Sequence, residues 1–356
     1  MDTENKKQIR FSKKAEIAVA AILVLLIVLG AVLFGRIRTI SNIKHIQGDL
    51  YSVDYFGDYN LDGILEQGVD SVESLVDFLS DELFFGFPIE TNENLFGCTA
   101  FVAHTPDGKQ VIGRNFDYAK SGALLVHTQP SKGYESYSMI TLSHIGVAEE
   151  TNTMPDTFMG KFSILAAPYA CVDGMNEKGL SVSVLELETE PTIQDNGKTD
   201  IITTVAVRML LDRCATTEEA ITELGKYDMF SSAGMPYHLL ITDADNRTVV
   251  VEWPEQEMVV LEESLATNFQ LAKGKDYGVG IGQDRYEIAK KRLDEKNGIL
   301  TEEETMKLLE DAKVTWNGEW GTEWSVVYNV DDFSVMICND MDYENVYRFA
   351  SSKTKN

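Results

Sequence analysis

A cysteine, an arginine and an aspartate, Cys98, Arg114 and Asp117, lie close together in this sequence and could take part in one reaction. A thiol reacts as its thiolate, and a nearby guanidinium group favours that form. The grouping therefore suits a nucleophilic cysteine. Taken alone it has modest specificity, because a small buried cysteine near a surface ion pair would look the same.

The segment that follows Cys98 is expected to form a β-hairpin. Two short apolar runs flank a Thr-Pro-Asp-Gly sequence, which is a strong turn signal. If the hairpin is symmetric about Asp107-Gly108, Cys98 lies opposite Asp117, with Cβ atoms roughly 4.5–5.5 Å apart. Arg114, three positions before Asp117, would then point to the other face, unless a bulge or the strand end brings it round.

Three separated stretches extend this grouping into a pattern. They are Gly97-Cys98-Thr99 with Gly113-Arg114-Asn115-Phe116-Asp117-Tyr118, then Asp173-Gly-Met-Asn176-Glu-Lys-Gly179-Leu, and finally Thr267-Asn268-Phe269 with Asp284-Arg285-Tyr286. In this order they resemble the signatures of the linear-amide hydrolases. That family includes choloylglycine (bile salt) hydrolases, penicillin V acylases, acid ceramidase and the N-acylethanolamine-hydrolysing acid amidase.

The resemblance covers roughly residues 97–290, and its combination of motifs is much more specific than any single piece. It implies an α+β fold of the N-terminal-nucleophile type, with four αββα layers in which two stacked antiparallel sheets lie between helices.

An enzyme of this type needs its cysteine at the start of a chain. The α-amine of such a cysteine has an unperturbed pKa of roughly 7.7–8.0, close to the thiol's roughly 8.5, so it can take the thiol proton and return it later. Cys98 becomes a chain start only if the Gly97–Cys98 bond is broken. The resemblance implies that the thiol itself makes this cut.

The resemblance also assigns roles to the surrounding residues. Asp117 would hold the α-amine, and Arg114 would favour and orient the thiolate. Asn268 would donate a hydrogen bond into the oxyanion hole, where loss of one donor typically costs roughly 100- to 1000-fold in rate. Arg285 would steady the site or contact substrate.

Glu186 helps to subdivide the family. It stands ten positions after Asn176, where bile salt hydrolases carry an oxyanion-hole asparagine. Acid ceramidase and its amidase relative have a glutamate in that region, so the sequence leans towards the lipid-amide branch. The alternative is an exposed strand carboxylate beside Glu188 and Glu190.

Hydrophobic periodicity indicates which elements surround these residues. Helices are expected at residues 64–84, 201–214, 217–226, 285–293 and 301–312, and further strands at 238–242, 248–253, 257–261, 325–329 and 334–338. Helical and strand runs are segregated rather than alternating, which favours stacked antiparallel sheets covered by helices.

The N-terminal region has a different character. Residues 18–34 are apolar and uncharged, with lysines and an arginine before them and further basic residues after them. This predicts a signal-anchor transmembrane helix that leaves the N-terminus in the cytoplasm and everything after residue 40 outside the cell membrane. A cleaved signal peptide is the alternative, but no clear cleavage site follows the apolar run.

Composition narrows the range of partners. The 356 residues carry a net charge of −26, which repels phosphate backbones and makes nucleic acid an unsuitable partner. Nothing indicates a bound metal or a cofactor, since C-x-x-C and H-E-x-x-H patterns are absent from the sequence. His238 is expected to be a hydrogen-bonded core residue, and Cys171, Cys214 and Cys338 small buried residues.

These observations predict three segments. Residues 1–40 form a tail and anchor, residues 41–97 a leader with an amphipathic helix, and residues 98–356 the amidase domain. The expected function is a self-processed cysteine amidase that acts on a small N-acyl amide, such as a lipid amide, with the leader still attached. The alternatives are a bile salt hydrolase, a penicillin acylase or acyltransferase of the same family, and a non-catalytic anchored binding domain.

Overall fold

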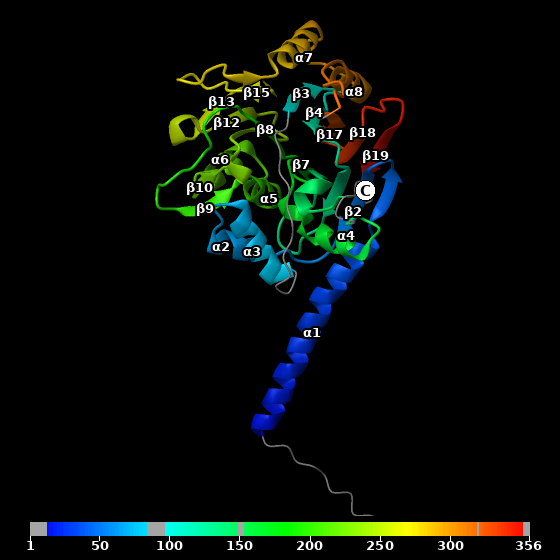
Figure 1. Ribbon diagram of the computed structural model, residues 1–356, viewed down its shortest axis with the longest axis vertical. Coiled ribbons are helices and arrows are strands. Elements are labelled where there is room, and N and C mark those ends of the chain that lie inside the picture. Colours follow the sequence, from blue (N-terminus) through cyan, green and yellow to red (C-terminus); the bar gives the residue numbers. More distant parts are fainter. Residues whose placement is uncertain (1–12, 84–96, 149–152, 319, 352–356) are drawn as a thin grey trace, which may run out of the picture.

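Two β-sheets are stacked face to face, and helices cover both outer sides (Figure 1). The structure, a computed structural model, describes residues 13–83, 97–148, 153–318 and 320–351. Strands of the two sheets contact each other directly, β3 packing against β8 and β11. The order of layers is therefore helix, sheet, sheet, helix, as the sequence predicts.

The larger sheet has nine strands, and its order shows that the leader is part of it. Neighbouring strands run antiparallel except β2 and β5, which are parallel. In spatial order the strands are β1 (Lys44–Gln47), β2 (Leu50–Tyr55), β5 (Ala123–Thr128), β6 (Ser136–Thr141), β7 (Asp173–Asn176), β8 (Ser181–Glu186), β11 (Tyr237–Thr242), β12 (Thr248–Glu252) and β13 (Val259–Leu261).

The smaller sheet has six antiparallel strands and carries Cys98 near one end of β3. Its strands are β14 (Leu265–Ala266), β3 (Gly97–His104), β4 (Gln110–Tyr118), β17 (Gly321–Asn329), β18 (Ser334–Asn339) and β19 (Val346–Ala350). Two short pairs complete the strands, β9 (Thr199–Ile202) with β10 (Tyr227–Phe230) and β15 (Asn268–Phe269) with β16 (Gly280–Ile281).

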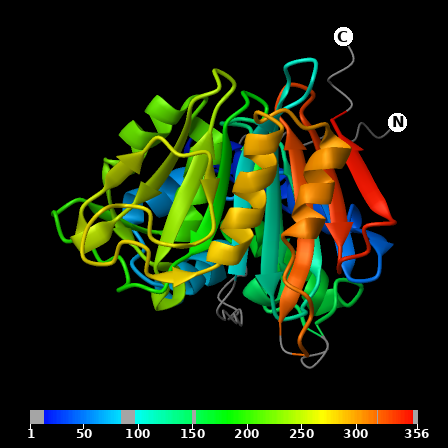
Figure 2. The ribbon, with the colours of Figure 1, turned by 90° about the horizontal axis from the view of Figure 1, so that it is seen from above.

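Helices α7 (Gln283–Glu295) and α8 (Glu302–Asp311) lie side by side over the six-stranded sheet (Figure 2). The nine-stranded sheet is covered by α5 (Thr203–Arg213), and α6 (Thr217–Leu224) packs on α5 and β10. Threonine side chains cap α6 and α8, and α8 begins with the capping box that its Thr-Glu-Glu-Glu sequence predicts. These four helices lie where periodicity predicts them.

The remaining helical segments lie at the end of the domain from which α1 (Lys13–Ser41) projects (Figure 1). They are α2 (Leu61–Gln67), α3 (Val72–Leu83), α4 (Phe158–Ser163), η1 (Leu142–Ile145) and η2 (Ile164–Tyr169), and two short turns, η3 (Ser232–Gly234) and η4 (Pro254–Gln256), lie elsewhere. Among the described residues, no helix combines the length and the apolar character needed to cross a bilayer. Side chains 25–29, 31 and 32 of the predicted anchor lie outside the described part.

The single helix predicted at residues 64–84 is wrong. The chain forms α2 and α3 instead, separated at Gly68, whose φ of +81° ends α2. The Val69 N–H then donates to the carbonyl of Asp200, within β9, at 2.8 Å. Apolar spacing continues through this break, because both helices bury one face in the main core, which is why periodicity alone does not reveal it. Residue 84 lies outside the described residues.

Candidate active site

The hairpin that carries Cys98 differs by one residue from the predicted register. Gly97 pairs with Asp117, and Cys98 pairs with Phe116. The prediction that Cys98 lies opposite Asp117 is therefore wrong. The cause is the turn: Thr105 N–H donates to the Lys109 carbonyl at 2.8 Å, which leaves three residues in the loop. Gly108, with φ at +88°, supplies the left-handed residue that such a loop needs.

This register sorts the charged residues onto the two faces of the sheet. Arg114 pairs with Ala100, two residues from Cys98, so Arg114 and Cys98 share the face towards the second sheet. The Arg114 Nη1 atom lies 3.2 Å from the Cys98 Sγ atom. Asp117 points to the opposite face, beneath the helices. The structure thus reverses the predicted placement of the two residues.

Arg114 is fully buried, and its guanidinium contacts other groups in addition to the Cys98 thiol. Its Nε atom lies 2.8 Å from an oxygen of Asp173, itself fully buried, and its Nη2 atom donates to the Val184 carbonyl at 2.7 Å. Burial alone lowers the pKa of the Arg114 guanidinium, but Cys98 and Asp173 outweigh it and raise that pKa. Asp173 is a site residue that the sequence analysis missed, although it opens the second family-like motif; Tyr328 donates to its other oxygen.

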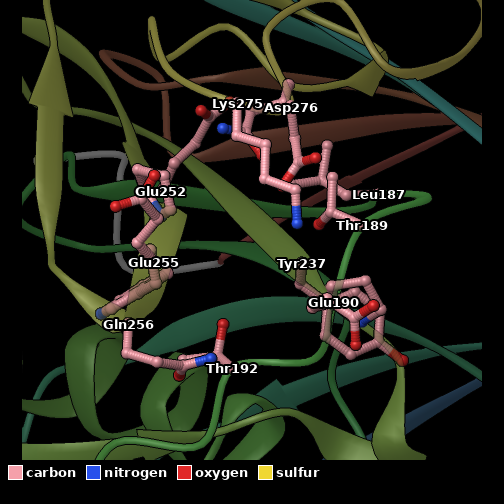
Figure 3. Close-up of a pocket in the computed structure, with 14 residues that line it drawn as sticks. Leu187, Thr189, Glu190, Thr192, Tyr237, Glu252, Glu255, Gln256, Lys275 and Asp276 are labelled. Atoms are coloured by element: carbon pink, nitrogen blue, oxygen red, sulfur yellow. The ribbon is translucent and has the colours of Figure 1, made fainter.

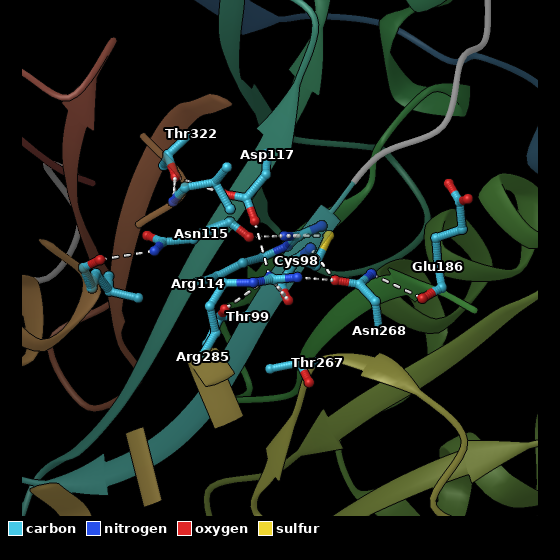
Figure 4. Close-up of polar contacts among 12 residues, drawn as sticks. Cys98, Thr99, Arg114, Asn115, Asp117, Glu186, Thr267, Asn268, Arg285 and Thr322 are labelled. Atoms are coloured by element: carbon cyan, nitrogen blue, oxygen red, sulfur yellow. Dashed lines mark hydrogen bonds and ion pairs between the residues drawn. The ribbon is translucent and has the colours of Figure 1, made fainter. Parts of the chain in front are cut away.

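Arg285, from the first turn of α7, organises the opposite face. Its Nη1 atom donates to the Cys98 carbonyl at 2.5 Å and lies 3.0 Å from an Asp117 oxygen (Figure 4). Gly282 permits this approach, since a Cβ there would lie 2.6 Å from the guanidinium. Burial raises the pKa of the Asp117 carboxyl, and Arg285 and the Thr322 hydroxyl, which donates at 2.6 Å, act against that rise.

Asn268 joins these groups to the backbone of Cys98. Its Oδ1 atom accepts from the Cys98 N–H at 2.6 Å and from Arg285 at 2.9 Å. Because a guanidinium has only donors, these bonds fix which amide atom is the oxygen. The Nδ2 atom donates to the Glu186 backbone carbonyl at 2.8 Å.

Glu186 is the predicted site residue that takes part through its backbone. In Figure 4 its carboxylate points away from the thiol, while its carbonyl meets Asn268. The side chain is buried, so the alternative of an exposed strand carboxylate is wrong. A role for the carboxylate in the reaction stays a prediction.

The Cys98 thiol is fully buried. Burial raises its pKa to about 12, and the opposing effect of Arg114 is smaller. At neutral pH the group is therefore a thiol rather than a thiolate. Gly97, the preceding residue, leaves little room for a side chain: a Cβ there would lie 3.0 Å from the Trp320 ring and 3.1 Å from the Asp117 carboxylate.

A cavity of about 180 Å³ opens beside the Asn268 segment (Figure 3). Its lining residues include Leu187, which directly follows Glu186 in the chain, and Gln270, which lies two residues after Asn268. Acidic side chains dominate its charged groups, with one lysine among them: Glu190, Glu252, Glu255, Lys275 and Asp276. The pocket therefore suits neutral or cationic groups better than anions.

Other sequence predictions concern residues away from the thiol. His238 is fully buried and bonded to Glu252 and the Thr267 carbonyl, which confirms it as a hydrogen-bonded core residue. Cys171, Cys214 and Cys338 are buried and free, as predicted.

Comparison with known proteins identifies the family. The sequence profile of the family described as "Linear amide C-N hydrolases, choloylglycine hydrolase family" matches residues 98–319. No curated protein matches the sequence.

Among solved structures, the chain is similar to a variant conjugated bile acid hydrolase from Clostridium perfringens, with 16% identity and a TM-score of 0.50, over 72% of this chain and 93% of the other. It is also similar to penicillin V acylase from Agrobacterium tumefaciens, with 16% identity and a TM-score of 0.50, over 72% and 87% of the two chains. These likenesses show the shared fold. The chain belongs to the choloylglycine hydrolase family of linear amide C–N hydrolases and is an amide hydrolase.

Proposed function

We propose that Cys98 becomes the nucleophile of an N-acyl amide hydrolase once the Gly97–Cys98 bond is cut. The observation that carries this proposal is the 3.2 Å contact between its sulfur and the buried Arg114. Arg285 and Asn268 hold the backbone of the same residue. A buried cysteine without a reactive role has no need of a guanidinium group on its sulfur.

The cut itself is proposed to use the same thiol. The Cys98 sulfur attacks the Gly97 carbonyl carbon, the C–N bond breaks, and a thioester forms while the nitrogen takes up the thiol proton. Water then hydrolyses the thioester, which releases a Gly97 carboxylate and leaves Cys98 with a free amine and a free thiol. The amine supplies the nearby base that the buried thiol, with its raised pKa, lacks in the uncut chain.

In turnover, the α-amine takes the thiol proton and the thiolate attacks the substrate carbonyl. The oxyanion is stabilised by Asn268, whose Nδ2 atom has two hydrogens and uses one on Glu186. The leaving amine takes the proton, and water hydrolyses the thioester to the acid. Asp117 lies beside Gly97, which supports a role for its carboxylate in holding the new α-ammonium group.

The proposed substrate is a neutral N-acyl amide, such as a lipid amide. Conjugated bile salts and penicillins carry a negative charge, which the acidic wall of the cavity beside Asn268 disfavours. Glu186, at the position where bile salt hydrolases carry an asparagine, supports the same lipid-amide branch of the family. Transfer of the acyl group to another amine, rather than water, is the alternative for the last step.

The test of this function is the mass and N-terminal sequence of the purified full-length protein. We expect a fragment that begins at Cys98, together with hydrolysis of a neutral N-acyl amide. A chain that stays uncut and inactive at every pH tested would refute the proposal.

Replacing Glu186 by asparagine is expected to leave the fold intact, because the Asn268 contact uses only the backbone carbonyl. The ratio of kcat/KM between anionic and neutral acyl amides should rise by about tenfold, because the substitution removes a negative charge directly before Leu187, which lines the cavity. Glu190→Gln, which removes a negative charge from the cavity wall itself, is the control for simple loss of charge. If this ratio is the same in Glu186→Asn as in wild type, Glu186 does not determine the substrate preference.

We further propose that the leader, residues 41–97, stays bound after the cut and that residues 18–34 anchor the protein in the cell membrane. Strand β2 pairs along its whole length with β5. Tyr59 is buried, and its hydroxyl donates to Asp212 at 2.5 Å. The apolar faces of α2 and α3 belong to the main core. Separation would expose all of this surface to water.

After complete cleavage, the leader is expected to co-elute with residues 98–356 in size-exclusion chromatography in detergent. The two pieces should separate only in denaturant, because sheet hydrogen bonds and buried apolar area hold them. Elution of the leader as a separate peak under native conditions would show that cleavage releases the catalytic part.

A further inference from the structure

We infer that His238 and Glu252, on adjacent strands of the nine-stranded sheet, form a buried pair that positions Asn268 for the reaction. This inference rests on the proposed function of Asn268. Neither side chain contacts Cys98 through any interaction in the described residues, so the pair acts through the segment that carries Asn268.

Glu252 binds one side of that segment. Its carboxylate accepts the Leu271 N–H at 2.8 Å and the Ala272 N–H at 2.7 Å. A third bond, of 2.8 Å, comes from the His238 Nδ1 atom. Burial raises the pKa of the Glu252 carboxyl, but His238 and the two backbone N–H groups outweigh it and lower that pKa, so the group is a carboxylate.

His238 binds the other side of the segment. Its Nε2 atom lies 2.7 Å from the Thr267 carbonyl oxygen, one residue before Asn268. A carboxylate and a carbonyl can only accept hydrogen bonds, so each ring nitrogen of His238 must carry a hydrogen. The side chain is buried against the Glu252 carboxylate, with both ring nitrogens used as donors.

The pair thus holds the chain at Thr267 and again at Leu271 and Ala272, with Asn268 between these points. The segment has little other regular structure: β15 comprises two residues and pairs only with β16, another two-residue strand, in the described chain. Asn268 must align with Arg285, the Cys98 N–H and the Glu186 carbonyl at once. Displacement by about 1 Å would cost about 100-fold in rate.

The pair lies between the acidic cavity and the segment that carries Asn268. Glu252 lines the acidic cavity, as Figure 3 shows, while His238 lies on the side of Thr267. The other charged groups on that cavity wall are Glu190, Glu255, Lys275 and Asp276. Leu185 of β8, the strand neighbour of His238, contributes no charge.

The experiment uses full-length Glu252→Gln and His238→Gln, with Asp243→Asn as the matched control. Asp243 lies at the other end of the β11–β12 hairpin, is equally buried, and also accepts backbone N–H bonds, but those bonds hold α6 and the turn. We expect self-cleavage and kcat to fall about 10- to 100-fold in the two pair variants, with KM changed less than twofold. Asp243→Asn should lower thermal stability but keep both rates within about twofold.

Two further readouts do not depend on activity. The ring ¹⁵N shifts of His238 should report two protonated nitrogens in wild type, and hydrogen exchange at residues 267–272 should accelerate in Glu252→Gln. Rates in the pair variants equal to those of Asp243→Asn would overturn the inference. If wild type neither cleaves itself nor hydrolyses amides, the proposed function fails. Hydrogen exchange then tests the positioning role separately. If exchange at residues 267–272 is the same in Glu252→Gln as in wild type, the positioning role is rejected.

Discussion

Cys98→Ala is expected to leave the chain at its full length and without amidase activity. Both effects follow from one atom, because in the proposed mechanism the same sulfur cuts the Gly97–Cys98 bond and later attacks substrate. Alanine also removes the acceptor from Arg114 but fits the space, so the fold should remain. Intact mass and turnover of a neutral N-acyl amide measure the two losses, each of about 10⁴-fold or more, as for other covalent nucleophiles.

Cys338→Ala is the matched control for this variant. Cys338 lies in the same sheet, on β18, and is as buried as Cys98, but it packs in the second core cluster beneath the helices. This variant should cleave itself and turn over substrate like wild type. A Cys98→Ala protein that is cut and active would refute the mechanism, because the proposed nucleophile would be absent from it.

Breaking the Arg114–Asp173 pair is expected to have the second-largest effect. Both side chains are fully buried, so Asp173→Ala leaves a guanidinium group without its carboxylate. Losing one partner of such a pair costs about 3–5 kcal/mol of unfolding free energy. Urea unfolding measures this loss, and self-cleavage should slow as Arg114 moves away from the sulfur.

The double variant Arg114→Met with Asp173→Leu separates stability from chemistry. Apolar residues of similar volume often replace a buried ion pair without loss of stability, so most of the unfolding free energy should return. Self-cleavage should not return, since no cation then faces the Cys98 sulfur. A double variant that is stable and cleaves at the wild-type rate would show that Arg114 serves packing alone.

Local signals in the sequence predicted much of this structure. Apolar periodicity located α5 to α8, and segregated strands and helices predicted the layered α+β fold. Threonine caps mark the start of α6 and α8. The family-like motifs led to five of the residues that surround Cys98. These features depend on residues near one another in the chain, or on short patterns with a direct physical cause.

The errors arose where a single residue in a turn, or a distant part of the chain, determines the structure. The hairpin register depends on whether two or three residues fill the turn, and one extra residue changed which of Arg114 and Asp117 shares a face with Cys98. Asp173 becomes part of the site only because β7 brings it beneath Arg114 from the other sheet. The strands β1 and β2 went unrecognised because residues 44–55 are mixed in polarity, and their sheet partner, β5, follows much later.

Strand β2 has one more consequence, which concerns the route to the folded state. In the uncut chain, its parallel pairing with β5 closes a loop within a single molecule. After cleavage at Gly97 the same pairing joins two molecules, and association of two pieces depends on their concentration. The cut enzyme, once denatured, should therefore refold poorly from dilute solution, while uncut Cys98→Ala refolds independently of dilution. The stability of the cleaved enzyme would then be kinetic: the native state would last because it unfolds slowly, and not because unfolded pieces refold.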